Sequence, residues 1–313
     1  MKRALPALAT VSLLALAGCG STSGDDASAE RDGGLAVAAA FYPLQWASEQ
    51  VGGDHVEVTS LTKPGAEPHD LELTPKDVTE MASADVVVYL AGFQPAVDDA
   101  VSSEAQEAGF DVSPEADLDL AAPAEGHDHG EEGAEEEHKE GQDPHFWLDP
   151  VRFEQVVTAI GERFATEDPD NAQDYRANAE ATVADLKTLD EEYRTGLADC
   201  ASTDLVTGHA AFGYLAERYG LSQEGIAGLS PDVEPDAATL RELAAHIEEH
   251  GVTTVYSETL VSPDLAETLA RETGASVAVL DPIEGITDET QGSNYLEVMR
   301  SNLTTLEQGQ QCH

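Results

Sequence analysis

Basic residues are scarce in this chain. It has 15 Lys and Arg residues against 62 Asp and Glu residues, so its formal net charge is −47. Proteins that bind nucleic acid use basic patches to neutralise phosphate, and this composition excludes nucleic acid as a partner. The excess of carboxylates favours solubility and raises the local concentration of cations around the protein.

Long hydrophobic runs are also missing. Residues 4–16 are apolar and follow a short basic start, but they are too short for a membrane-spanning helix, which needs ~20 residues. The segment ends in a lipobox-like LAGC sequence at Cys19. We therefore expect a signal peptide over residues 1–18, an acylated Cys19, and a polar tether over residues 19–33 that anchors the protein to the outer face of the cell membrane.

Cysteine is rare, with three residues in the whole chain. If Cys19 carries lipid, Cys200 and Cys312 remain as a pair, and a compartment outside the cytoplasm permits a disulfide between them. The alternative is two free thiols, which are uncommon in that compartment. A bond between them would fix the C-terminal helix to the start of the second half of the chain.

Strand and helix patterns alternate twice along the chain. The first half has short apolar runs at residues 35–40, 55–61, 85–90 and 110–112, with helical patterns between most of them. The second half repeats the alternation from residue 204 onward. This pattern predicts an α/β fold in which two α/β lobes with parallel sheets are joined by a long rigid interlobe helix. We expect an N-terminal lobe over residues 34–150, linking helices over 151–199 and a C-terminal lobe over 200–313.

An acidic loop, expected over residues 119–143, interrupts the first half. Residues 126–145, which run from within this loop to His145, read GHDHGEEGAEEEHKEGQDPH and lack apolar residues that would help to fill a hydrophobic core. Histidine mixed with carboxylates indicates a weak accessory metal loop formed by His127, His129 and His138. The alternative is a solvated acidic linker whose histidines are incidental.

Four metal-capable residues follow predicted strands or the acidic loop. They are His69, His145, His209 and Asp281. In parallel sheets, ligands bind beyond the C-terminal ends of strands, so these side chains are expected to meet between the lobes. Each residue also has an alternative role without metal. His69 could be a surface loop residue and His145 a packed histidine. His209 could lie at the entry of a helix, and Asp281 could cap a turn.

Three imidazoles and one carboxylate are the ligand set that tetrahedral Zn²⁺ favours. Mn²⁺ prefers more oxygen ligands, so it is the less favoured ion. Glu67 lies close to His69 in the sequence, where it is expected to act as an alternative ligand or to hydrogen-bond to one. Because histidine binds zinc only when deprotonated, binding should weaken as the pH falls through about 6.5.

Two other histidines, His246 and His250, lie four residues apart on a predicted helix that is rich in Glu. Their spacing allows a ligand pair, but the composition favours a solvated face. A zinc hydrolase is the alternative from another functional class, and it would need a position open to water with a general base nearby. The chain has no HExxH motif, and Glu258 is the candidate base.

The sequence resembles the zinc/manganese receptor family of ATP-driven bacterial importers over about residues 35–306. The loop GAEPHDLELTP around His69 looks like the family's first-ligand loop, and DPHFWLDP around His145 looks like its second. His209 in GHAAF looks like the third ligand. Asp281 in LDP matches a carboxylate that serves as the fourth ligand in some members.

This resemblance implies one high-affinity ion between the lobes, delivery to an ABC-type permease with a cytoplasmic ATPase, and no turnover of substrate. A histidine at position 209 and an acidic histidine-containing loop both favour the zinc-selective branch, with a manganese receptor as the alternative. We expect a monomer. Some exposed lipoproteins of this type also act as adhesins, but nothing in this sequence supports that role directly.

Overall fold

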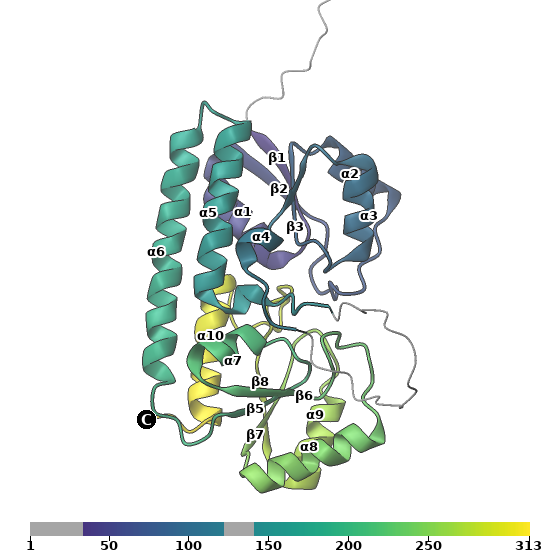
Figure 1. Ribbon diagram of the computed structural model, residues 1–313, viewed down its shortest axis with the longest axis vertical. Coiled ribbons are helices and arrows are strands. Elements are labelled where there is room, and N and C mark those ends of the chain that lie inside the picture. Colours follow the sequence, from purple (N-terminus) through teal and green to yellow (C-terminus); the bar gives the residue numbers. More distant parts are fainter. Residues whose placement is uncertain (1–33, 122–140) are drawn as a thin grey trace, which may run out of the picture. The chain divides into compact units, whose positions relative to one another are not determined.

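The computed structural model describes residues 34–121 and 141–313, and from residue 34 onward the chain forms one compact unit. Within this unit lie two four-stranded parallel sheets with helices packed around them (Figure 1). This confirms the predicted fold of two α/β lobes. The expected signal peptide, tether and lipid-bearing Cys19, and the loop residues His127, His129 and His138, lie outside the described residues.

The first sheet has the order β2-β1-β3-β4. Its strands are β1 (Leu35–Ala39), β2 (Val56–Ser60), β3 (Val86–Tyr89) and β4 (Gly109–Asp111). Its helices and turns are α1 (Tyr42–Gly52), the 3-10 turn η1 (Gly53–His55), α2 (Pro75–Ser83), α3 (Pro95–Glu104) and α4 (Ser113–Ala116). Thr74 caps α2 as its sequence predicts: Thr74 Oγ1 accepts from Asp77 N, while the Asp77 carboxylate accepts from Thr74 N at 2.8 Å.

The second sheet repeats this arrangement in the order β6-β5-β7-β8. Its strands are β5 (Asp204–Thr207), β6 (Ser222–Gly225), β7 (Thr254–Ser257) and β8 (Ser276–Val279). The helices of this half are α7 (Gly213–Tyr219), α8 (Ala237–His250), α9 (Asp264–Thr273) and α10 (Tyr295–Gly309). Gly220, Gly251 and Gly274 end the first three of these helices in the left-handed conformation that glycine adopts at low cost.

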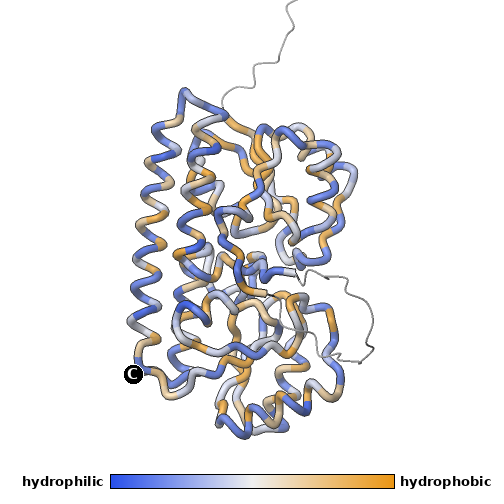
Figure 2. The backbone as a smooth tube through the Cα atoms, viewed as in Figure 1, coloured by the Kyte–Doolittle hydropathy of each residue, from blue (hydrophilic) through white to orange (hydrophobic). Residues whose placement is uncertain are grey.

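Two long helices connect the lobes. After the 3-10 turn η2 (Phe146–Leu148), α5 (Pro150–Glu167) turns back into α6 (Ala172–Gly196). Early in α6, the Asn178 side chain donates to Val51 O of α1 at 3.0 Å. Near its other end, the Tyr193 hydroxyl donates to Met299 O of α10 at 2.6 Å. Helix α6 therefore bridges both halves of the chain. Hydrophobic and hydrophilic residues alternate along it (Figure 2).

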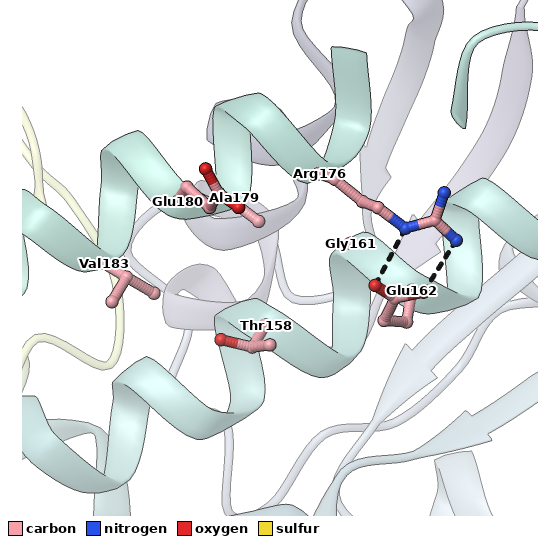
Figure 3. Close-up of a pocket in the computed structure, with 7 residues that line it drawn as sticks. All are labelled: Thr158, Gly161, Glu162, Arg176, Ala179, Glu180 and Val183. Atoms are coloured by element: carbon pink, nitrogen blue, oxygen red, sulfur yellow. Dashed lines mark hydrogen bonds and ion pairs between the residues drawn. The ribbon is translucent and has the colours of Figure 1, made fainter. Parts of the chain in front are cut away.

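Close contact between α5 and α6 depends on small residues. A Cβ placed on Gly161 would lie 2.9 Å from the Cβ of Ala179. A shallow pocket opens beside this contact, where Arg176 forms an ion pair with Glu162 (Figure 3). The pocket is lined by Thr158, Gly161, Glu162, Arg176, Ala179, Glu180 and Val183, so it is separate from the residues that the sequence singled out.

A disulfide joins Cys200, just after α6, to Cys312, just after α10. It fixes the C-terminal end of the chain beside the start of the second lobe. Within the described residues, no helix combines the length and the apolar character needed to span a lipid bilayer.

Candidate metal centre

His69 lies in the proline-rich loop between β2 and α2. Glu67 orders this loop, because its two carboxylate oxygens accept from the backbone N–H groups of His69 and Asp70 at 3.1 and 3.2 Å. The Gln94 side chain donates to Pro68 O at 3.1 Å, and the ring of Phe93 packs edge-on against the His69 imidazole with centroids 4.7 Å apart. Polar contacts therefore hold the backbone of this loop, and an aromatic contact holds the His69 ring.

His145 is completely buried at the start of η2. One oxygen of Asp143 accepts from the backbone N–H of His145 at 2.9 Å and lies 2.7 Å from its Nδ1. A carboxylate beside Nδ1 selects the tautomer that carries its proton there, which leaves the lone pair of Nε2 free for a metal ion. In turn, the Tyr214 hydroxyl donates to Asp143 O at 3.1 Å.

His209 has the same arrangement in the other lobe. It follows β5, and Glu258, which follows β7, accepts from the His209 backbone N–H at 2.7 Å. The second oxygen of Glu258 lies 2.7 Å from His209 Nδ1. Glycine at position 208 leaves room for this contact, because a Cβ there would lie 2.4 Å from the Glu258 carboxylate and would displace it. The lone pair of His209 Nε2 therefore also remains free for a metal ion.

Glu284 supplies the fourth group, from the turn that follows β8. It is buried, and its Oε1 lies 3.1 Å from His69 Nε2, 3.2 Å from His145 Nε2 and 3.4 Å from His209 Nε2. The Nε2 atoms of His145 and His69 are 3.3 Å apart, and those of His209 and His145 are 3.4 Å apart. These four atoms are the only ligand group among the described residues that contains three histidines.

The spacing of these atoms matches a tetrahedral zinc shell. Ligands ~2.0 Å from a tetrahedral ion are separated from one another by ~3.3 Å. The five separations given above run from 3.1 to 3.4 Å. Two of the ligand atoms come from each lobe, so an ion at their centre would be bound by both.

In this cluster, the negative charge of the carboxylates and the positive charge of protonated histidines stabilise each other. Burial opposes ionisation of Glu284, but the three surrounding histidines outweigh it and hold the pKa of Glu284 well below its usual value. Burial also opposes protonation of His209, yet the carboxylates of Glu258 and Glu284 raise its pKa well above the usual value. The pKa of His145 is raised by Asp143 in the same way, whereas burial lowers the pKa of His69.

The structure places Asp281 outside this group of four. One of its oxygens accepts from the backbone N–H of Ile283 at 2.8 Å, and the other accepts from the Thr259 hydroxyl at 3.0 Å. One oxygen thus binds within the turn that carries Glu284, and the other binds a residue that follows β7. Glu67 also orders a ligand loop, and its carboxylate lies 3.9 Å from His69 Nε2.

Glu284, which the structure places with the three histidines, is not among the residues predicted from the sequence, and neither are the supporting positions of Asp143 and Glu258. LDPIEG contains two carboxylates, and the position of Asp281 directly after the predicted strand favours it, because the ends of strands line such clefts. Ile283 has φ of +60°, an uncommon conformation for a β-branched residue, and this reversal separates the surroundings of Asp281 from those of Glu284. No sequence pattern signals that backbone state.

Comparison with known proteins agrees with this geometry. The family model described as zinc-uptake complex component A, periplasmic, matches residues 37–309. The chain is 38% identical to the high-affinity zinc uptake system protein ZnuA of Bacillus subtilis strain 168, over 94% of this chain and 93% of that protein. It is 36% identical to the zinc-binding lipoprotein AdcA of Streptococcus pneumoniae R6, over 98% of this chain but 61% of that longer protein.

Among solved structures, the chain is similar to the laminin-binding protein Lmb of Streptococcus agalactiae, described as bifunctional with adhesin and metal-transporting activity. The TM-score is 0.77 at 31% identity, covering 88% of this chain and 99% of that one. The family match, the sequence identity and the fold all agree over nearly the whole described chain. The protein therefore belongs to the family of zinc-uptake complex component A, the ZnuA family.

Proposed function

We propose that this protein is an extracytoplasmic zinc receptor that binds one Zn²⁺ between its lobes and delivers it to an ABC-type importer, whose permease works with a cytoplasmic ATPase. One observation carries this proposal: four ligand atoms lie at the corners of a tetrahedron of the size that zinc requires. They are His69 Nε2, His145 Nε2, His209 Nε2 and Glu284 Oε1. The zinc-uptake family and its zinc-binding relatives support the same ion.

Zinc fits this donor set better than manganese does. Three nitrogens and one carboxylate oxygen suit Zn²⁺, while Mn²⁺ favours more oxygen ligands and a higher coordination number. The carboxylates of Asp143 and Glu258 are already occupied by histidine Nδ1 atoms and backbone N–H groups. They are therefore not available to enlarge the oxygen shell that manganese would require.

A receptor also fits better than a zinc hydrolase. A catalytic zinc site keeps one position for water, whereas a tetrahedral ion held by four protein groups has no such position. Glu258, the candidate base, uses one oxygen on the His209 backbone N–H and the other on His209 Nδ1. With both oxygens engaged in orienting a ligand, Glu258 is a positioning residue in this proposal, and the protein has no enzymatic activity.

Zinc binding should displace protons from the site. Carboxylates raise the pKa of His145 and His209, so these imidazoles hold protons in the metal-free protein up to a higher pH than free histidine does. A histidine that ligates zinc must give up its Nε2 proton. Affinity should therefore be greatest above the raised pKa values and should fall as the pH drops through them.

The location and the partners complete this proposal. The signal and lipobox at the N-terminus support a chain anchored by lipid on Cys19 at the outer face of the membrane, and the relative AdcA is named a lipoprotein. One chain supplies all four ligand groups, so a monomer is sufficient to bind the ion. The acidic loop with His127, His129 and His138 is proposed as an accessory that binds zinc weakly.

A competition titration against a chelator of known zinc affinity tests the proposal. His209→Ala should weaken tight zinc binding by about 100-fold or more, because it removes a ligand, and ligand loss should exceed the 10–100-fold cost of losing an outer partner. The matched control is His55→Ala, which removes a histidine paired with Asp174 away from the cluster. Equal affinities for His209→Ala and the unsubstituted chain would remove this residue from the site.

A further inference from the structure

We propose a second divalent-metal site in the C-terminal lobe, formed by Asp204, His246 and His250. Asp204 begins β5, whereas His209 follows the end of the same strand. Five residues of extended chain span about 15 Å, so this group lies at the opposite edge of the sheet from the buried cluster. The two histidines lie at the C-terminal end of α8, which packs beside β5.

The helix presents the two imidazoles together. His246 and His250 are four residues apart, a spacing that places side chains on the same face of a helix one turn apart. Their rings are stacked, with centroids 4.1 Å apart and an angle of 20° between the planes, so one ring must rotate before both in-plane lone pairs can meet at one ion. The same spacing of two histidines on a helix forms the zinc-binding pair of HExxH proteins. Leu243 and Ile247 bury the adjacent face of α8 and fix its rotation.

Asp204 completes a set of three ligand atoms that lie within 4.8 Å of one another. Its Oδ1 lies 3.2 Å from His246 Nε2 and 3.2 Å from His250 Nδ1. Both distances are close to the ~3.3 Å edge of a tetrahedral zinc shell. His246 Nε2 is shielded from solvent and makes no hydrogen bond, although the carboxylate oxygen is so close. An ion between these atoms would satisfy that nitrogen.

The site is open to solvent on one side. The side chains of His246, Asp204 and His250 are 23%, 19% and 44% exposed, so an ion can enter without movement of the lobes and water can complete its coordination. The protein offers two nitrogens and one oxygen here, so the site should bind Zn²⁺ more weakly than the four-ligand centre does. The same three groups should also bind Cu²⁺ or Ni²⁺. Bound metal would link the end of α8 to the start of β5 and stabilise the C-terminal lobe.

Zinc titration of the full-length chain purified in detergent tests this site. We compare the unsubstituted chain with His246→Ala/His250→Ala by equilibrium dialysis and by calorimetry. The double variant should lose one weaker equivalent of zinc and keep the tight equivalent. An unchanged number of bound ions in the double variant would overturn the proposal. Circular dichroism checks that each variant is folded.

Single substitutions keep the test decisive if the double variant folds poorly. His250→Gln and Asp204→Asn are close in shape to the native residues, and each should weaken the second equivalent by about 10-fold or more. In Cu²⁺-loaded protein, electron paramagnetic resonance should show nitrogen couplings that His250→Gln removes. Unchanged weak binding and unchanged spectra in both variants would reject the site.

Controls separate this inference from the proposed function. His55→Ala removes a half-exposed histidine that faces one aspartate, Asp174, at 3.1 Å, and it should change neither equivalent. His209→Ala should abolish the tight equivalent while leaving the weaker one. If the tight equivalent is lost only in His209→Ala and the weaker one only in the α8 variants, the two sites are independent.

Discussion

Asp143 and Glu258 orient two ligands from opposite lobes by the same chemistry. Each carboxylate receives the backbone N–H of its histidine and lies 2.7 Å from that histidine's Nδ1. The two contacts fix both the position of the ring and its tautomer, so Nε2 points to the ion with its lone pair available. At the scale of residues, the orientation of both rings is thus set before any ion arrives, and binding has only to displace their Nε2 protons.

Asp281 plays a related part for Glu284, as a positioning residue. Its two hydrogen bonds, from Ile283 N and the Thr259 hydroxyl, stabilise a turn in which Ile283 holds φ of +60°. Left-handed conformation costs an ordinary residue about 1–2 kcal/mol, so the turn needs such support. Trp147 Nε1 adds a further bond to Pro282 O at 2.8 Å.

We therefore expect Asp281→Ala to weaken zinc binding by about 10–100-fold without changing the stoichiometry, because Glu284 loses its support but remains a ligand. Glu284→Ala should weaken binding more. Both are measured by chelator competition, with Asp288→Ala as the control, since it removes an exposed carboxylate from the same segment. A larger loss for Asp281→Ala than for Glu284→Ala would instead make Asp281 the ligand.

The three histidines of this cluster are among the residues predicted from the sequence, but Glu284 is not, and the reason is local. His69 and His145 lie in long, distinctive motifs, and His209 directly follows a strand. Glu284 lies in a turn whose direction depends on one residue in an unusual backbone conformation, and on hydrogen bonds from residues far away in the chain. Propensity and periodicity carry no information about such a turn.

Elements were more predictable than side-chain directions. Strand β5 begins at residue 204, where the second alternation is predicted to start, and Thr74 followed by Pro75 is a sequence pattern typical of a helix start, as observed for α2. The short helix α4 was missed, because its four residues give no periodicity. The linking helices predicted over residues 151–199 are α5 and α6, which the structure shows packed side by side (Figure 1).

That pairing gives a prediction at the scale of elements. Gly161→Val should lower the free energy of unfolding by about 1–3 kcal/mol, because overpacking between the closely spaced helices costs that much. The added Cβ would lie 2.9 Å from Ala179 Cβ and 3.5 Å from Tyr175 O. Urea denaturation followed by circular dichroism measures the change.

The matched control for this substitution is Gly141→Val. A Cβ at Gly141 meets no described atom within 4 Å, so this variant should be nearly as stable as the unsubstituted chain. If the two variants had equal stability, close packing at Gly161 would not be what holds α5 against α6.

At the scale of the whole described unit, the cluster depends on two separate sheets. His69 and His145 belong to the first half of the chain, and His209 and Glu284 to the second, with α6 bonded to helices of both. An ion bound to all four groups therefore ties the halves together. A receptor that must later release its ion can do so by separating two pairs of ligands, with no covalent change.

The central claim is that one zinc ion is bound jointly by both halves. Anomalous diffraction from crystals of the zinc-loaded protein, measured on both sides of the zinc absorption edge, tests it most directly. The account predicts the strongest peak ~2.0–2.2 Å from Nε2 of His69, His145 and His209 and from Glu284 Oε1. A strongest peak that contacts residues of only one half would contradict it.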